Sequence, residues 1–137
     1  MVTSSVLMSI QPGYAKAILD GTKTVELRRR RPSFSEGTTV LVYSSSPDRE
    51  VRGAFDAGEV LAGAPDELWL LVRDRAGVAR ADFLTYFAGC AVAYAIEVRN
   101  PRRIEPARLK FRPPQSYLFL QRSDRDHRAL LRLAPAG

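Results

Sequence analysis

The segment from Gly21 to Arg28, G-T-K-T-V-E-L-R, places a lysine, a glutamate and an arginine close together in the chain. Lys23 can donate hydrogen bonds to a phosphate or a carbonyl oxygen, and Arg28 can make a bidentate contact with a phosphate or a base edge. Glu26 can hold both cations in place, and it can accept a proton or a base amino group. The three side chains therefore suit the floor of a polar binding cleft. The alternative is a surface strand whose charges only pair with one another, which contributes little to stability.

A predicted helix and a predicted strand position these charges. Pro12 suits the first turn of a helix and Gly21 suits a helix end, so we expect a helix between them. The strand that follows alternates apolar and polar residues, so its apolar side chains face the core while Glu26 and Arg28 face the opposite side. Lys23 lies at the junction of the two elements, where its head group can still meet that of Glu26. We therefore expect a polar cleft beside the first helix.

The rest of the chain alternates short strands with short helices. Two glycines interrupt one strand and predict a bend or a bulge in it, and Val25 and Leu27 are expected in the core. We expect strands over residues 6–10, 24–29, 38–43, 51–61, 90–98 and 117–120, helices over residues 12–20, 66–72 and 79–88, and a polar tail that can be helical from residue 124. This pattern predicts one compact α+β domain over residues 1–137, with its core over about residues 6–120 and a C-terminal tail over residues 121–137.

A second candidate segment is F-R-P-P-Q-S-Y, from Phe111 to Tyr117. Its two prolines stiffen the backbone. Arg112, Gln115, Ser116 and Tyr117 offer a guanidinium, an amide, a hydroxyl and an aromatic face within six residues. A glutamine can read an adenine edge, and a tyrosine can stack on an unpaired base. The segment therefore suits a wall of the cleft, although a rigid turn that leads into the next strand explains it too.

Three further groups are candidates for the site. Ser44 and Ser45 end a buried strand, where hydroxyls and backbone amides commonly contact phosphate or base edges, and a plain turn is equally consistent with them. Arg30 belongs to a run of four arginines that we expect to be partly site and partly solvated surface. Tyr86 and Phe87 could stack on a base, but their helical spacing favours the core.

Composition narrows the function classes. The net charge of +6 favours a polyanionic partner such as RNA or DNA, although a coding bias toward arginine and alanine explains it equally. One cysteine, Cys90, and one histidine, His127, exclude an internal disulfide and argue against a zinc site. Cys90 is expected to be a small buried residue, and we expect no metal and no cofactor. The N-terminus is unlike a signal peptide and no apolar run approaches the roughly 20 residues of a membrane helix, which predicts a cytoplasmic protein.

The octapeptide fits the G-x-K-x-x-E-x-R signature of the ASCH domain, a branch of the PUA-like nucleic-acid-binding folds. The opening segment from Leu7 to Pro32 and five later segments resemble the family in the same order, and together they cover most of residues 6–120. The later segments are V-Y-S-S-S-P, D-E-L-W, Y-F-A-G, Y-A-I-E-V and F-R-P-P-Q-S-Y. The resemblance implies a PUA-like small β-barrel of five to six strands, closed or nearly closed and flanked by short helices, with the signature lining a cleft between barrel and helix. It also implies a role linked to RNA.

Two functions are expected from the residues and the resemblance. The first is a module that binds RNA or a modified nucleotide in a cleft lined by Lys23, Glu26 and Arg28. The alternative is a metal-independent enzyme, either a ribonuclease or an N4-acetylcytidine amidohydrolase, in which Lys23 and Glu26 are catalytic. The amidohydrolases of the family resemble the chain at Lys23 but have a threonine in place of Glu26, and Asp74 is the nearest candidate for their separate carboxylate. RNA, DNA and a free nucleoside are all open as ligands, as is the oligomeric state.

Overall fold

One six-stranded sheet and four helices make up the part of the chain that the computed structural model describes, residues 4–134. The domain expected over residues 1–137 extends beyond these residues at both ends. The strands are β1 (Ser5–Ile10), β2 (Val25–Arg28), β3 (Thr39–Ser44), β4 (Glu50–Gly63), β5 (Ala93–Ala107) and β6 (Tyr117–Phe119). The helices are α1 (Pro12–Asp20), α2 (Pro65–Val72), α3 (Arg80–Tyr86) and α4 (Arg125–Leu133).

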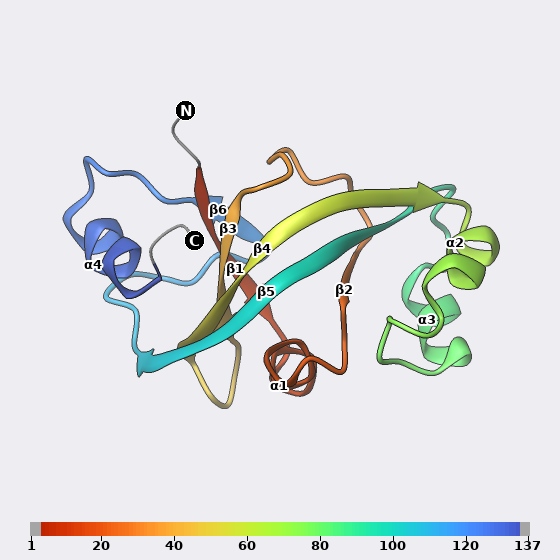
Figure 1. The fold of residues 1–137 in the computed structure, drawn as a ribbon, viewed down its shortest axis with the longest axis horizontal. Helices are drawn as coiled ribbons and strands as arrows, with labels where there is room; N and C mark the ends of the chain where they lie inside the picture. The colour runs from red at the N-terminus through yellow and green to blue at the C-terminus, as the bar shows by residue number, and fades with distance from the viewer. Residues whose placement is uncertain (1–3, 135–137) are drawn as a thin grey trace.

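The sheet is a curled half-barrel with the strand order β2-β5-β4-β3-β1-β6. Strands β1 and β3 are parallel, and the other neighbouring strands are antiparallel. The long strands β4 and β5 cross most of the molecule and bend as they do so (Figure 1). The expected α+β class is therefore confirmed. Within the described residues, however, the edge strands β2 and β6 do not pair with each other, so the sheet is open where a closed or nearly closed barrel was expected.

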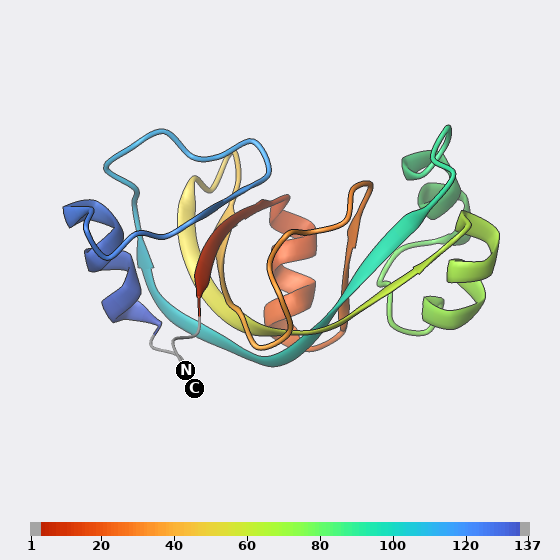
Figure 2. The same cartoon turned by 90° about the horizontal axis from the view of Figure 1, so that it is seen from above.

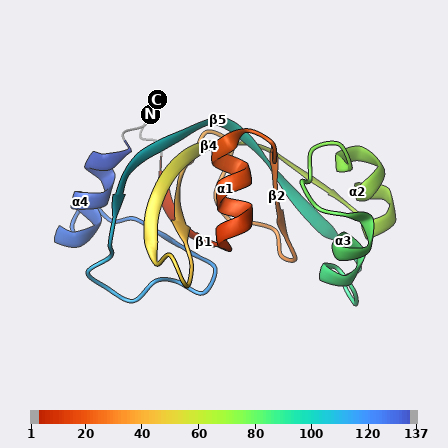
Figure 3. The same cartoon turned by 90° about the horizontal axis from the view of Figure 1, so that it is seen from below.

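Helix α1 has the limits that the sequence predicts. Pro12 occupies its first turn, and Gly21 ends it in a left-handed conformation, with φ of 86°, from which its N–H bonds back to helix carbonyls. The buried residues of the helix are Ala15, Ile18 and Leu19. The first two join a core cluster with side chains from β1, β3, β4 and β5, and α1 lies within the curve of the sheet in Figure 3.

The predicted irregularity of β4 is confirmed by shifts of register against both of its neighbours. At Gly53 a Cβ atom would lie 2.4 Å from the carbonyl oxygen of Arg102 and 2.5 Å from a methyl group of Leu19. A side chain cannot fit at that distance, so the close approach of α1 and β5 to β4 requires a glycine there.

Strand β5 is longer than predicted. We expected a strand over residues 90–98, but β5 begins at Ala93 and continues to Ala107 through Pro101 and Pro106. A proline has no N–H to donate to a ladder and is normally confined to edges or bulges. Here the register between β4 and β5 skips residues around both prolines, because the paired residues pass from Arg99 to Arg102 and from Arg103 to Ala107. Both prolines thus lie at positions of β5 where the hydrogen-bond ladder with β4 requires no backbone N–H donor.

The remaining helices pack at opposite ends of the molecule (Figure 1). Helices α2 and α3 cover one end, with Leu68, Val72 and Phe83 in a core cluster that also contains Val25 and Leu27 of β2. The predicted burial of these two β2 residues is therefore confirmed. Helix α4 packs at the other end, and residues 135–137 of the predicted tail lie outside the described residues. No helix within residues 4–134 has the length and apolar character needed to cross a membrane.

Candidate functional site

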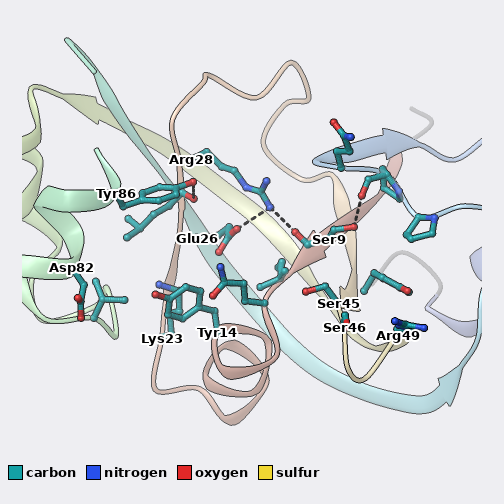
Figure 4. Close-up of a pocket in the computed structure, with 18 of the residues that line it drawn as sticks. Ser9, Tyr14, Lys23, Glu26, Arg28, Ser45, Ser46, Arg49, Asp82 and Tyr86 are labelled. Atoms are coloured by element: carbon teal, nitrogen blue, oxygen red, sulfur yellow. Dashed lines mark hydrogen bonds and ion pairs between the residues drawn. The ribbon is translucent and has the colours of Figure 1, made fainter. Parts of the chain in front are cut away.

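A cleft with a volume of about 920 Å³ lies between α1, β2 and α3 on one side and the turn after β3 and the β5–β6 connection on the other (Figure 4). Most of its polar lining comes from segments that are far apart in the sequence. The polar residues that line it are Ser9, Gln11, Tyr14, Lys23, Glu26, Arg28, Tyr43, Ser45, Ser46, Arg49, Asp82, Tyr86, Arg112 and Gln115.

Glu26 and Arg28 form an ion pair at the floor of the cleft. The distance from Nη2 of Arg28 to Oε2 of Glu26 is 2.9 Å, and the side chains are 15% and 8% exposed. Arg28 also donates to the carbonyl oxygen of Ser9 and to Oγ of Ser116, each at 3.2 Å. Arg28 therefore connects β2 to β1 and to the β5–β6 connection, and it arranges the cleft from within.

Lys23 is almost completely buried at the same floor, with 1% of its surface exposed. Its Nζ donates to the carbonyl oxygen of Ala76 and lies 4.9 Å from the ring centroid of Tyr14, which is close enough for a cation–π contact. The stem of Lys23 packs against Gly77, where a Cβ atom would be 3.0 Å from the Cβ of Lys23. The α2–α3 connection thus holds Lys23 in place. Lys23 and Glu26, whose head groups we expected to meet, form no ion pair within the described structure.

Burial shifts the acid–base properties of these groups. It raises the pKa of Glu26 above its ordinary value, against the opposing effects of Arg28 and Lys23. It lowers the pKa of Lys23, against the opposing effect of Glu26. It also raises the pKa of Tyr86. Glu26 and Lys23 are therefore each shifted toward neutral pH, which is where a group that exchanges protons is useful.

Six of the predicted site residues line the cleft, namely Lys23, Glu26, Arg28, Ser45, Arg112 and Gln115. Four others do not. Arg30 is exposed beyond the end of β2. Ser44 is fully buried and donates to the carboxylate of Asp48. Ser116 supports Arg28 from outside the cleft, and Tyr117 packs its ring against Phe34 while its hydroxyl bonds to Ser33.

The cleft also contains residues that the sequence reasoning assigned elsewhere or did not mark. Tyr86, expected in the core, is 43% exposed, lines the cleft and donates to the carbonyl oxygen of Leu27, whereas Phe87 is buried as expected. Tyr14 lies on the cleft side of α1. A tyrosine on an amphipathic helix often lies where the core meets a polar region, because its hydroxyl needs a hydrogen-bond partner. This property could have marked Tyr14 and Tyr86 as cleft residues from the sequence.

No motif in the sequence pointed to Arg49 or Asp82 as site residues. Arg49 is exposed in the turn after β3 and has φ of 53°, an uncommon value for a residue with a side chain. Asp82 lies in the first turn of α3. Both line the cleft, and they lie at opposite sides of it in Figure 4. By contrast Asp74, the candidate carboxylate of an amidohydrolase, is exposed and does not line the cleft.

Within residues 4–134 no group of three histidine, cysteine, aspartate or glutamate side chains could hold a metal ion. Cys90 is partly exposed where burial was expected, and its Sγ accepts a hydrogen bond from Nε of Arg29 at 3.4 Å.

Comparisons with known proteins agree with this architecture. The sequence profile of the ASCH domain matches residues 8–106. The ASCH domain-containing ribonuclease of Zymomonas mobilis is 30% identical over 126 residues, which span 86% of this chain and 85% of that protein.

The crystal structure of ASCH from Zymomonas mobilis superposes with a TM-score of 0.84 at 29% identity and covers 93% of this chain and 94% of its own. A variant of the Zymomonas protein, in which phenylalanine replaces one tyrosine, superposes with a TM-score of 0.86 at 28% identity and covers 94% and 97%. The PUA-like α+β architecture expected from the sequence is therefore confirmed, as a half-barrel in place of the closed barrel, and the chain belongs to the ASCH domain family.

Proposed function

We propose that the cleft binds single-stranded RNA, with one nucleotide inside the cleft and its phosphates at the rim. The observation that carries the proposal is a cleft that has buried charges at its floor and exposed arginines at its rim. The similarity to a protein named as a ribonuclease supports RNA as the nucleic acid.

Arg49 and Arg112 are the rim residues suited to phosphate. Both are exposed, both line the cleft, and neither takes part in an ion pair within the described residues. An arginine without a protein partner can form charge-assisted and bidentate bonds with a phosphate at little cost. Arg28 is different, because it is already bonded to Glu26 and Ser9.

The interior of the cleft suits a base. Tyr14 and Tyr86 line the cleft and are 37% and 43% exposed, so they offer aromatic faces on which an unpaired base can stack. Glu26 can accept from a base amino group, and Gln115 can donate to and accept from a base edge.

A binding titration tests the proposal. A labelled single-stranded RNA of about ten nucleotides is titrated with protein at several salt concentrations. We expect Arg49→Ala and Arg112→Ala each to weaken binding and to reduce the salt slope by about 0.7 for each lost phosphate contact. Arg30→Ala is the matched control, because Arg30 is exposed but does not line the cleft. Equal losses in all three variants would point to general charge instead of the cleft.

A second candidate function is metal-independent cleavage of RNA. It is favoured by the similarity to the Zymomonas ribonuclease and by the raised pKa of Glu26, which suits a proton acceptor. Lys23 could stabilise negative charge that develops on the phosphate. The amidohydrolase alternative has less support, because Asp74 lies outside the cleft.

The same samples, in a buffer with a chelator, separate the two functions. For a binding module, Glu26→Gln weakens RNA binding by roughly 1–3 kcal/mol and the RNA stays intact. For an enzyme, the native protein shortens the RNA, and Glu26→Gln keeps most of the binding while turnover falls by a factor on the order of 10²–10⁴. We expect the first result.

A further inference from the structure

The positive charge of the chain is concentrated in its C-terminal part. Residues 108–137 contain seven of the 21 lysines and arginines but two of the 15 aspartates and glutamates. Five of the six net positive charges therefore belong to this segment, which consists of the β5–β6 connection, β6 and α4. A charge spread by coding bias alone has no reason to gather in one part of the fold.

Helix α4 presents part of this charge to solvent. Arg125, Arg128 and Arg132 follow one another at spacings of three and four residues, so they share one face of the helix, and all three are exposed. The opposite face carries Leu130 and Ala134, which are buried in a core cluster with β1, β3 and β4. The helix is thus anchored by its apolar face and turns its arginines outward.

The β5–β6 connection adds charge beside the helix. Phe111 packs its ring against that of His127 of α4, with 5.1 Å between the centroids, and Leu109 packs against the same core cluster as the helix. The side chain of Arg128 donates to the carbonyl oxygen of Arg122, which holds the turn before α4 against the helix. We call the resulting set of exposed cations the α4 basic surface. It consists of Arg108, Lys110, Arg122, Arg125, Arg128 and Arg132.

These cations differ from the arginines of β5. Arg99, Arg102 and Arg103 each form an ion pair with a carboxylate of a neighbouring element. None of the six residues of the α4 basic surface forms an ion pair within residues 4–134. Two carboxylates lie beside this surface. Asp124 is the N-cap of α4, where it accepts from backbone N–H groups, and Asp126 lies in the first turn of α4 beside a groove that Arg108 and Lys110 also line. Neither carboxylate forms an ion pair with the six cations within residues 4–134. The surface therefore keeps its positive charge available for an external anion.

One stretch of chain connects the α4 basic surface with the rim of the cleft. Arg112, which lines the rim of the cleft, directly follows Phe111, the residue whose ring contacts α4. In Figure 2 the connection after β5 runs from the end of the molecule that carries α4 back toward the middle of the fold. The cations of the connection thus lead from α4 to the cleft along one stretch of chain.

We propose that the α4 basic surface binds the phosphate backbone of the RNA strand where the strand leaves the cleft, so that the ligand is an oligonucleotide and not a free nucleoside. The inference rests on the proposed function, because the cleft holds one nucleotide of the same strand. A row of unpaired cations beside an RNA site suits a backbone, since phosphate contacts are independent of sequence. An anionic membrane fits less well, because the apolar face of α4 is buried and has nothing to insert between lipids.

The test compares a short RNA with a long one. The triple variant Arg125→Gln, Arg128→Gln, Arg132→Gln is titrated with single-stranded RNAs of about four and about twenty nucleotides. We expect its affinity for the long RNA to fall about tenfold, with a salt slope smaller by about 2, because about 0.7 is lost for each of three phosphate contacts. Its affinity for the short RNA should stay within about twofold. A second variant, Arg108→Gln with Lys110→Gln, should also lose affinity for the long RNA alone, with a salt slope smaller by about 1.4 because two contacts are removed. It keeps the test valid if the triple variant is poorly folded.

The matched control is Arg30→Gln, Arg73→Gln, Arg80→Gln. These three arginines are exposed and do not line the cleft. Their substitution removes three positive charges, as the triple variant of α4 does. An equal loss in this control, or unchanged affinity of both test variants for the long RNA, overturns the inference while the proposed function stands. Native protein that binds neither RNA overturns the proposed function itself. Native protein that binds anionic vesicles but neither RNA overturns both in favour of a membrane surface.

Discussion

The charged residues of the site fall into two groups, buried residues with protein partners and exposed residues at the rim. Lys23 and Arg28 have protein partners and are largely buried, whereas Arg49 and Arg112 are exposed at the rim without ion pairs in the described structure. The buried charges organise the cleft, because removing one leaves its partner without compensation in a poorly solvated place. A variant at Arg28 therefore changes the shape and protonation of the site, while a variant at Arg49 removes a contact.

The protonation of Glu26 is a prediction at this scale. Burial raises its pKa in the folded protein, and Arg28 is the strongest of the groups that oppose the rise. Arg28→Met should therefore raise the pKa of Glu26 further, as followed by the carboxyl carbon shift in an NMR titration. Arg30→Met, which changes an exposed residue outside the cleft, should leave it as it was.

The sign for stability follows from the same shift. The folded state binds the proton of Glu26 more tightly than the unfolded chain does, so the group costs stability once it is ionised. Its contribution makes the free energy of unfolding fall as the pH rises from the ordinary pKa of Glu26 through the raised one. If the titration midpoint of Glu26 in the native protein lies at or below the ordinary pKa of a glutamate, the burial of this carboxyl group is contradicted.

At the scale of elements, the α2–α3 connection contacts the residues that lead into β2. Arg75 donates to Oγ1 of Thr24 and pairs with Glu97 of β5, and the N–H of Thr24 donates to the carbonyl oxygen of Arg75. The neighbouring carbonyl group of Ala76 accepts from Lys23. A connection outside the sheet thus positions the residues that lead into β2.

Gly77→Ala tests this coupling, with Gly89→Ala as the control. Both glycines have positive φ, so each alanine should lower the free energy of unfolding by about 1–2 kcal/mol. The new Cβ at residue 77 would press on the stem of Lys23, whereas nothing lies within 4 Å of the Cβ position at Gly89. RNA affinity, measured below the unfolding temperature of both variants, should fall for Gly77→Ala alone. Equal RNA affinities in the two variants would show that the position of Lys23 does not affect RNA binding.

The whole molecule has its cleft between two packed ends. Helices α2 and α3 sit on the far ends of β4 and β5, while α4 and the β1–β3 side form the other end (Figure 1). Strand β3 lies inside the sheet, and all six of its residues are buried. Helix α3 has seven residues, of which Phe83 alone is buried.

Amide hydrogen exchange should reflect this difference. We expect amides of α3 to exchange through local opening at a lower free energy than amides of β3, which should need global unfolding. Native-state exchange followed by NMR measures both sets in one sample. Identical opening free energies for α3 and β3 would show that the α2–α3 end unfolds together with the sheet.

Local signals in the sequence determined the elements and their faces. Pro12 and Gly21 set the limits of α1, and alternation along β2 placed Val25 and Leu27 in the core and Glu26 toward the cleft. These signals act through neighbouring residues in the chain, so they can be read without a structure. The resemblance in the octapeptide and the later segments supplied the family.

Tertiary structure alone decided which side chains share the cleft. Arg49 reaches it from the turn after β3, and Asp82 and Tyr86 reach it from α3. Ser116 and Tyr117 contact other partners although they belong to a predicted site segment. Membership of the cleft depends on contacts between segments far apart in the chain, and no local pattern encodes such contacts. The same holds for the prolines of β5, which a strand accepts because the register with β4 skips them.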